Sequence, residues 1–317
     1  MNSIEVHNLT KKFEKFTSVN NISFEVGEGE VFGFLGSNGA GKSTTIKMLC
    51  GILSPTSGDA NVGGFSIRDN PDMVKRNIGY MSQKFSLYND LTVSENINFF
   101  GGVYGLKDQI LRDRKKWVLE ISELNNKENT PASSLAVGYK QRLALGCAVI
   151  HEPKIVFLDE PTGGVDPISR RRFWDLINDL SEKGTTVFVT THYLDEAEFC
   201  NRIILIDEGK LIANGSPDEL KKMYITNPVI ELNTDDIYKT LEILEQEYYP
   251  GNISIFGNAL HVTLNESHST DTENEIKIIS DTIKNHSIVR INSIQRIEPS
   301  LEDVFMNLLE KKASDVK

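Results

Sequence analysis

One short stretch decides the fold of this chain. It reads Gly36-Ser37-Asn38-Gly39-Ala40-Gly41-Lys42-Ser43-Thr44. Glycine, four residues and then glycine-lysine-serine is the pattern of a loop whose backbone N–H groups surround phosphate oxygens. We therefore predict that residues 36–44 bind a nucleotide, with Lys42 on the β- and γ-phosphates and Ser43 on Mg²⁺.

The sequence on either side of the loop supports this prediction. Residues 31–35 form a short apolar run that suits a buried strand, and residues 44–49 suit a helix that ends at Gly51. A helix N-terminus that points at phosphate completes an anion site. The alternative is a glycine-rich turn without a ligand, which the flanking strand, helix, lysine and hydroxyl all disfavour.

Length and composition indicate an ordinary globular protein. The 317 residues suffice for one large domain or two ordinary ones, with 39% hydrophobic and 25% charged residues. A net charge of −11 argues against a broad nucleic-acid surface. Cys50, Cys147 and Cys200 fit neither a metal spacing nor a disulfide framework, so we expect reduced thiols in a cytoplasmic protein.

The sequence also bears on membrane association. The first residues lack the basic and apolar regions of a signal peptide. No apolar run approaches the ~18 residues that a membrane-spanning helix needs. We expect any association with a membrane to come through a partner or a surface contact.

Apolar patterning predicts an α/β core. Residues 4–9 and 22–26 alternate apolar and polar side chains, as strands of an antiparallel sheet do. Continuous apolar runs at 155–158, 186–190 and 203–206 suit buried parallel strands, and helical patterns follow the first two. This alternation favours a mostly parallel sheet with an N-terminal antiparallel sheet beside it.

Two further regions differ from this core. Residues 86–150 contain long helical stretches, at 109–124 and 141–150, and predict a helical insertion. The acidic tail, residues 229–317, again contains strand-like and helical runs, which predict a small α+β domain. We place the boundary after Asn227, which gives domains 1–227 and 228–317.

Two carboxylates follow the apolar run at 155–158. Open α/β sheets bind ligands at the carboxyl ends of their strands, where Asp159 and Glu160 stand. Asp159 is placed to hold Mg²⁺ through water, and Glu160 to polarise an attacking water. The alternative is a strand that ends in a solvated acidic turn, which the phosphate loop upstream disfavours.

Two more polar side chains stand at predicted strand ends. His192 follows residues 186–190, so it shares the edge of Asp159 and Glu160. We predict that it contacts the γ-phosphate, against the alternative of a structural hydrogen bond. Gln83 offers an amide that suits both the metal and the water, although its sequence context alone is weak evidence.

The order of these motifs resembles that of the ATPase subunits of ABC transporters over about residues 4–225. The matching segments are 36–44 for Walker A, Gln83 for the Q-loop, 158–162 for Walker B, Asp166 for the D-loop and His192 for the switch histidine. The resemblance implies an adenine-stacking aromatic residue at Phe13, with Phe16 as the weaker candidate. Either ring suits the core equally well.

One motif departs from the family pattern. The family signature is Leu-Ser-Gly-Gly-Gln, but the aligned stretch reads Leu135-Ala136-Val137-Gly138-Tyr139-Lys140-Gln141-Arg142. The resemblance implies that this segment caps ATP bound by the opposite subunit of a head-to-tail dimer. Ala136 lacks the serine hydroxyl, whereas the Gly138 N–H and the following helix remain, so we expect a slower but working site.

The tail resembles that of one group of these transporters. Subunits that end in Glu298-Pro299-Ser300-Leu301-Glu302-Asp303-Val304-Phe305 belong to the ABC-2 type exporters, which include multidrug, antibiotic and sodium efflux systems. The string equally suits a plain terminal helix with an apolar face. The resemblance implies ATP and Mg²⁺ as cofactors and separate multi-span membrane permease subunits, with the chain on the cytoplasmic face of the membrane.

The expected mechanism is closure of the dimer on ATP and reopening on hydrolysis. Its motion is expected to reach the permease near Gln83 and residues 84–88, whose apolar side chains equally suit the core. The rival function is a nucleotide-dependent regulator without transport. A DNA-repair ABC ATPase would need a long coiled coil, a ribosome-acting ABC factor usually has two cassettes, and a GTPase would need a guanine-binding motif. The sequence contains none of these three features. The sequence identifies neither the substrate nor whether the dimer is of like subunits.

Overall fold

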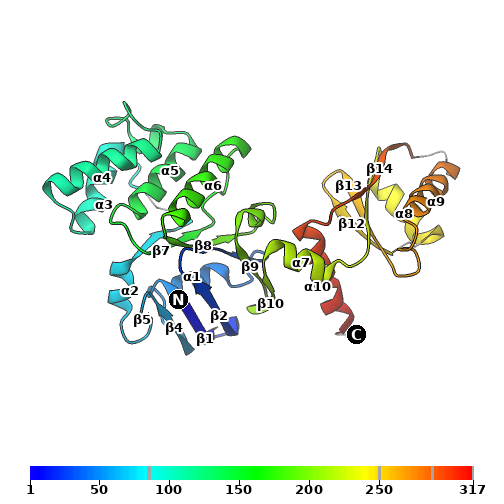
Figure 1. Ribbon diagram of the computed structural model, residues 1–317, viewed down its shortest axis with the longest axis horizontal. Helices are drawn as coiled ribbons and strands as arrows, with labels where there is room; N and C mark the ends of the chain where they lie inside the picture. The colour runs from blue at the N-terminus through cyan, green and yellow to red at the C-terminus, as the bar shows by residue number, and fades with distance from the viewer. Residues whose placement is uncertain (84–86, 249–250, 287–288, 316–317) are drawn as a thin grey trace. The chain divides into compact units, whose positions relative to one another are not determined.

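The computed structural model describes residues 1–83, 87–248, 251–286 and 289–315, with side chains in the last helix as far as residue 309. The chain divides into two compact units, Met1–Ser216 and Pro217–Lys317 (Figure 1). Each unit has its own sheet and its own apolar core, so each is described by itself.

A mostly parallel sheet forms the centre of the first unit. Its order is β10-β9-β3-β8-β7-β6, in which the edge strand β10 runs antiparallel to β9 and the other pairs are parallel. β3, β7 and β8 are apolar and buried along their whole length, as strands covered on both faces are. The bounds are β3 Val31–Leu35, β6 Ile78–Met81, β7 Ile155–Asp159, β8 Thr186–Thr191, β9 Arg202–Asp207 and β10 Lys210–Gly215.

An antiparallel sheet packs beside it. Its strands are β1 (Asn2–Phe13), β2 (Phe16–Gly27), β4 (Ser57–Val62) and β5 (Phe65–Ser66), in the order β2-β1-β4-β5. Helix α1 (Lys42–Leu49) lies between the two sheets (Figure 1). One apolar core joins all three elements, with a cluster of aromatic rings in it from Phe24, Phe32, Phe34, Phe157 and Phe188.

Helices dominate the next part of the first unit. Its core is formed by apolar side chains of α3, α4 and α5. A complete capping box starts α3, in which the Thr92 hydroxyl and the Glu95 carboxylate each satisfy a backbone N–H. The bounds are α2 Pro71–Asn77, α3 Val93–Val103, α4 Asp108–Ile121, the 3₁₀ helix η1 Ala132–Ser134, α5 Val137–Ala148, α6 Pro167–Glu182 and the 3₁₀ helix η2 Glu196–Phe199.

The second unit is a small α+β fold. Helices α8 and α9 cover an antiparallel sheet of order β12-β13-β11-β14, and their apolar faces form its core. Helix α10 packs against α7. The bounds are α7 Pro217–Tyr224, β11 Val229–Thr234, α8 Ile237–Glu247, β12 Gly251–Phe256, β13 Ala259–Leu264, α9 Thr272–Asn285, β14 Ile291–Ile297 and α10 Leu301–Asp315.

The structure departs from the sequence prediction in several places. The division between the units falls before α7, one helix earlier than the predicted boundary at 227/228, because α7 packs on α10. The predicted helix at 141–150 begins already at Val137. Strand β14 was not predicted.

None of the helices in the described part of the chain combines the length and the apolar character that crossing a membrane requires.

We expect Phe188→Ala to lower the free energy of unfolding by about 3–5 kcal/mol, because the ring is fully buried among other aromatic rings and its removal leaves a cavity. Urea denaturation of the full chain measures the change. Phe99→Ala is the matched control, since the Phe99 side chain is 42% exposed. An equal loss in both variants would contradict the assignment of Phe188 to the core.

A buried hydrogen bond between His261 and Asp303 ties α10 to the sheet of the second unit. His261 Nδ1 lies 2.8 Å from Asp303 Oδ1, and the backbone N–H and hydroxyl of Ser300 both donate to Oδ2 at 2.7 Å. Burial alone would raise the pKa of Asp303, but the hydrogen bonds from His261 and Ser300 outweigh it and hold that pKa below its usual value.

The stabilisation by Asp303 is therefore expected to depend on pH. A carboxyl group with a lowered pKa stabilises the fold above its unfolded pKa and loses that effect as the pH falls through its folded pKa. Asp303→Asn should lower stability at pH 7, and its difference from wild type should shrink below about pH 4. Urea denaturation across this range measures the difference, with the exposed Asp281→Asn as a control expected to show none.

Candidate nucleotide-binding site

The phosphate-loop residues connect the end of β3 to the start of α1. Glycine is required at two places where the loop passes close to other backbone. A Cβ on Gly36 would lie 2.2 Å from the Ile206 carbonyl oxygen, and one on Gly41 would lie 2.5 Å from that of Ser18. Gly41 also has φ 109°, which disfavours side chains. Helix α1 begins at Lys42, two residues before the start of the helix predicted at 44–49.

The side chains of the loop meet the ends of β7 and β8. Ser43 Oγ donates a hydrogen bond to Asp159 Oδ1 at 3.1 Å, and Thr190 Oγ1 donates to the same oxygen at 2.7 Å. Asp159 is buried, with 2% of its surface exposed. The predicted metal residues Ser43 and Asp159 thus lie in direct contact, and Thr190 orients the carboxylate.

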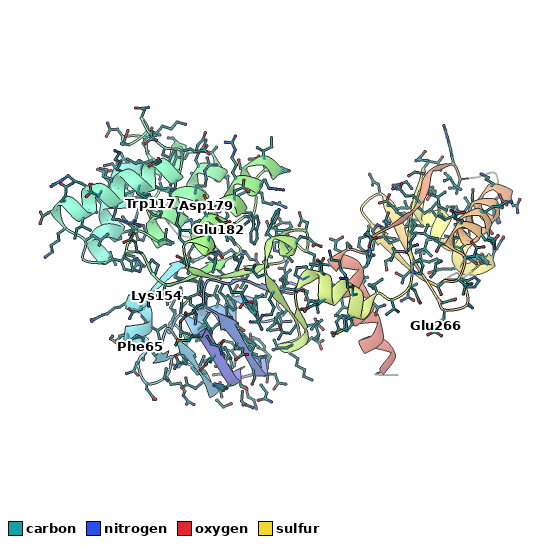
Figure 2. All side chains as sticks on the ribbon, in the orientation of Figure 1. Phe65, Trp117, Lys154, Asp179, Glu182 and Glu266 are labelled. Atoms are coloured by element: carbon teal, nitrogen blue, oxygen red, sulfur yellow. The ribbon has the colours of Figure 1, made fainter. Side chains whose placement is uncertain are left out.

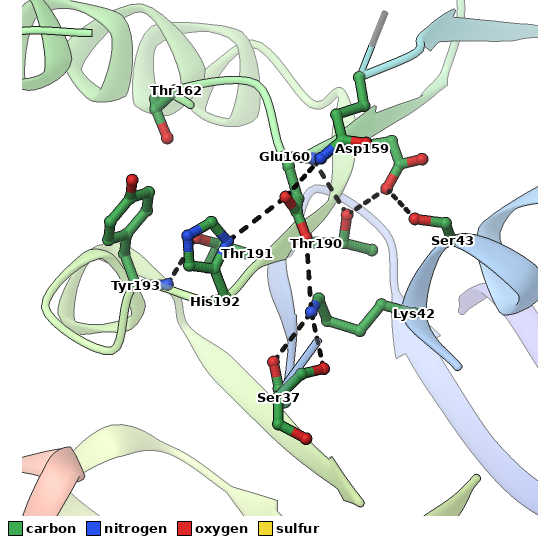
Figure 3. A network of polar contacts seen from close by, with 12 residues as sticks. Ser37, Lys42, Ser43, Asp159, Glu160, Thr162, Thr190, Thr191, His192 and Tyr193 are labelled. Atoms are coloured by element: carbon green, nitrogen blue, oxygen red, sulfur yellow. Dashed lines mark hydrogen bonds and ion pairs between the residues drawn. The ribbon is translucent and has the colours of Figure 1, made fainter. Parts of the chain in front are cut away.

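Glu160 is the centre of the site (Figure 3). Its Oε1 lies 3.4 Å from Lys42 Nζ, and its Oε2 lies 3.3 Å from His192 Nδ1. Gln83 Nε2 donates a hydrogen bond to Oε2 at 2.7 Å. The four residues predicted to act in catalysis therefore meet at a single carboxylate, although they come from four separate segments of the chain.

Backbone hydrogen bonds turn Glu160 into this position. Its φ is 48°, in the left-handed region that non-glycine residues rarely adopt. Its N–H donates to the carbonyl and hydroxyl oxygens of Thr190, at 3.0 and 3.1 Å. The neighbouring strand thus compensates for the unusual backbone.

Lys42 is buried and partly satisfied by its own loop. Its ammonium group donates to the carbonyl oxygens of Gly36 and Ser37, at 2.9 and 3.1 Å, and only 4% of the residue is exposed. A buried cation needs such partners, because leaving water is costly for a charge. These contacts hold the ammonium inside the loop, where the phosphates of a nucleotide would lie.

A cavity of about 340 Å³ opens over this loop. The residues that line this cavity include Phe16, Ser18, Asn38, Gly39, Ser43, Gln83 and Glu160. Phe13, the first-choice adenine residue, does not line the cavity but stacks on Phe16, with 5.3 Å between ring centroids. The structure thus favours Phe16, the weaker sequence candidate, as the ring that faces a nucleotide.

The signature stretch starts α5 in the helical part of the unit. Ala136 is the N-cap of that helix and provides no side-chain hydrogen bond, and Val137 is 47% exposed. Leu135 is buried in the helical core, and Gly138 packs so closely on Ser169 that a Cβ would lie 2.7 Å from it. Gln141 lies in the second turn of the same helix.

The Tyr139 ring, where the family has glutamine, contacts two cations. Lys127 Nζ is 4.5 Å and the Arg142 guanidinium carbon 4.7 Å from its centroid. This side chain therefore contributes to packing of the helical part.

The D-loop residue Asp166 is the N-cap of α6. Its carboxylate accepts a hydrogen bond from the Ser169 N–H at 2.9 Å, and this bond lowers the pKa of Asp166.

The donor set fits Mg²⁺ bound together with a nucleotide. The part of the chain that the structure describes holds no group of three or more His, Cys, Asp and Glu residues that suits a metal. Mg²⁺ needs no such group, because it is usually held by one or two protein oxygens, phosphate oxygens and water. The Ser43 hydroxyl and the Asp159 carboxylate supply hard oxygen ligands of this kind.

A second cavity, of about 690 Å³, lies at the opposite edge of the parallel sheet. Lys154 and Thr185, which precede β7 and β8, line it together with Trp117 of α4 (Figure 2 labels Lys154 and Trp117). None of the predicted site residues lines this cavity. It is larger than the hollow over the phosphate loop, but the chemistry of the site lies at the other end of the strands.

Sequence reasoning gave no role to three polar residues near the site. Thr190 and Thr191 end β8, and Glu196 begins η2, and all three are fully buried. Two consecutive hydroxyl side chains at the end of an otherwise apolar run could have indicated a functional role for Thr190 and Thr191. Nothing in the local sequence of Glu196 distinguishes it from the acidic residues around it.

The sequence matches a known family. The model of the family described as "ABC transporter" matches residues 19–163. The chain is 52% identical over 218 residues to the probable multidrug ABC transporter ATP-binding protein YbhF of Escherichia coli, which covers 69% of this chain. It spans only 38% of the length of that relative.

Another relative and a solved structure match a larger share of their own lengths. The linearmycin resistance ATP-binding protein LnrL of Bacillus subtilis is 34% identical over 98% of this chain and 100% of its own length. The dimeric ATP-binding cassette MJ0796, solved with ADP and Pi, aligns with a TM-score of 0.62 and 27% identity over 67% of this chain and 98% of its own. The chain therefore belongs to the ABC transporter family of ATP-binding proteins and has the fold of their ATPase cassettes.

Proposed function

We propose that the chain is the ATP-hydrolysing subunit of an ABC-2 type membrane exporter and acts as a dimer on separate membrane subunits. The observation that carries this proposal is the position of Glu160, in contact with Lys42, Gln83 and His192 at the carboxyl edge of the sheet. The arrangement supports the proposal, because hydrolysis of ATP needs a base, a phosphate-binding cation and orienting groups close to one another.

The groups have distinct roles in hydrolysis. Glu160 accepts a proton from the attacking water, which a carboxylate does efficiently when it is held in place. Lys42 and the loop N–H groups bind the β- and γ-phosphates and stabilise the negative charge that develops on them. His192 and Gln83 orient the water and the γ-phosphate. Mg²⁺ held by Ser43 and Asp159 would neutralise phosphate charge.

A dimer supplies the remaining side of the site. Solved relatives include a cassette whose dimeric structure contains ADP and Pi. We infer that the start of α5 caps ATP bound to the opposite subunit with the Gly138 N–H and the positive end of its dipole. Because Ala136 offers no hydroxyl, this cap is weaker than that of a serine-containing signature.

The names of the relatives favour export. One is named for multidrug transport, one for linearmycin resistance and several for Nod factor export. The proposed permease contact lies near Gln83 and residues 84–88. Residues 84–86 lie outside the described part of the chain. Leu87 packs on the helical core, and Tyr88 is 51% exposed against Phe99.

Co-purification tests the transporter assignment. A full-length tagged chain, expressed with its neighbouring genes and extracted in mild detergent, should retain a multi-span membrane protein. This partner would place the chain on the cytoplasmic face of the membrane. ATP hydrolysis without any such partner would favour the nucleotide-dependent regulator instead.

We expect Glu160→Gln to lower kcat for ATP hydrolysis at least about 100-fold, because loss of a positioned general base costs 10²–10⁴-fold. ATP affinity should persist, and an ATP-bound dimer should accumulate in size-exclusion chromatography. Glu182→Gln, at an exposed position on α6, is the matched control and should keep wild-type turnover. Normal turnover in Glu160→Gln would contradict the proposed mechanism.

Ala136→Ser tests the altered signature. A serine at this N-cap should stabilise α5 by about 1 kcal/mol and add a hydroxyl for the partner's nucleotide. We expect a higher denaturation midpoint, tighter ATP-dependent dimerisation and faster hydrolysis. Ala136→Asn separates the two effects, since asparagine also caps a helix but has no hydroxyl. Equal turnover in both variants would limit the effect to the helix cap.

A further inference from the structure

We propose that Glu196 is a positioning residue of the nucleotide site, whose carboxylate holds the turn that carries His192 against the segment that carries Glu160. Glu196 belongs to η2, outside all the motifs that the sequence analysis used. Its side chain is fully buried, with 0% of its surface exposed. A buried carboxylate is costly unless its oxygens are well paired, so its partners indicate its role.

Both carboxylate oxygens accept hydrogen bonds from threonine hydroxyls next to the site. Thr162 donates to Oε1 at 2.5 Å, and Thr191 donates to Oε2 at 2.7 Å. Thr162 stands two residues after Glu160, and Thr191 stands immediately before His192. One carboxylate therefore joins the segments after β7 and β8 at the point where each presents its functional side chain.

Thr191 transmits this contact to the histidine turn. Its hydroxyl donates to Glu196 and also accepts a hydrogen bond from the Tyr193 N–H at 3.0 Å. Residues on both sides of His192 are thus anchored to the same hydroxyl. The His192 ring, packed on the Tyr193 ring at 4.1 Å between centroids, lies 3.3 Å from Glu160.

A cation from α6 completes the cluster. Arg170 Nε lies 3.4 Å from Glu196 Oε1, and its Nη1 lies 3.4 Å from Asp195. The same guanidinium covers the Tyr193 ring at 4.4 Å. Because Asp166 caps α6, this contact links the D-loop helix to the histidine turn.

Burial has the largest effect on the pKa of Glu196. Burial raises the pKa of Glu196, while the two hydroxyl groups and Arg170 oppose that rise. The contacts of the carboxylate with threonine hydroxyls and with a guanidinium suit the ionised form. An amide in its place would lose the pairing with Arg170 and present an N–H₂ group toward a hydroxyl donor.

The kinetic test uses Glu196→Gln and rests on the proposed ATP hydrolysis. We expect kcat to fall at least about tenfold with little change in KM, because small misplacements of catalytic groups are costly. In a His192→Ala background, the same change should have almost no further effect. Unchanged kcat, or an equal loss in that background, would overturn the proposal. Glu198→Gln is the matched control, at an exposed position of η2.

If Glu196→Gln does not fold, two variants of Thr191 test the same hydrogen bond from the other side. Thr191→Val removes the hydroxyl and keeps the side-chain volume, and we expect the same fall in kcat. Thr191→Ser keeps the hydroxyl and should retain most of the wild-type turnover. Equal turnover in the valine and serine variants would overturn the proposal.

A structural readout needs no ATP turnover, so it decides the positioning role even where hydrolysis itself fails. In the full-length chain labelled with ¹⁵N-histidine, the His192 ring signals are assigned by their loss in His192→Ala. Glu196→Gln should shift these signals, whereas Glu198→Gln should leave them in place. Unchanged His192 signals in Glu196→Gln would overturn the proposal.

Discussion

The contact between β7 and β8 at their carboxyl ends is the constraint on which the site depends. Thr190 donates to the Asp159 carboxylate at 2.7 Å and accepts from the Glu160 N–H through both of its oxygens. The parallel register that pairs Asp159 with Thr190 makes these bonds possible. That register is maintained by the buried aromatic and aliphatic side chains beneath it. The positions of two carboxylates, a serine and a histidine therefore follow from core packing.

Opposite charges and dipoles satisfy the buried polar groups of the site. Lys42 and Glu160 are both largely buried, and each finds opposite charge or dipoles within 3.4 Å. A nucleotide would replace the carbonyl oxygens around Lys42 with phosphates and leave the carboxylate facing the γ-phosphate. Polar partners thus fix the side chains that the proposed mechanism uses, and such preorganisation reduces the reorganisation that a reaction needs.

The second unit follows a different physical logic. Its sheet and two helices form an independent apolar core, and the buried pair of His261 and Asp303 fixes α10 to that sheet. The Pro-Ser-Leu-Glu-Asp-Val-Phe string that resembled exporter tails thus has a structural role, since Ser300 and Asp303 cap the helix and Leu301 and Val304 are buried. That role agrees with the plain-helix alternative and leaves the resemblance to exporters intact.

The sequence by itself determined the phosphate loop, the two carboxylates at the end of β7, the histidine after β8 and most of the strands. These features are local, because glycine spacing, apolar runs and helix caps act within a few residues. Only the tertiary structure decided which distant groups meet. It favoured Phe16 over Phe13, assigned α7 to the second unit and brought Thr190 and Glu196 to the site. Such contacts depend on strand order and on packing between segments 30 or more residues apart in the chain, and no local pattern encodes them.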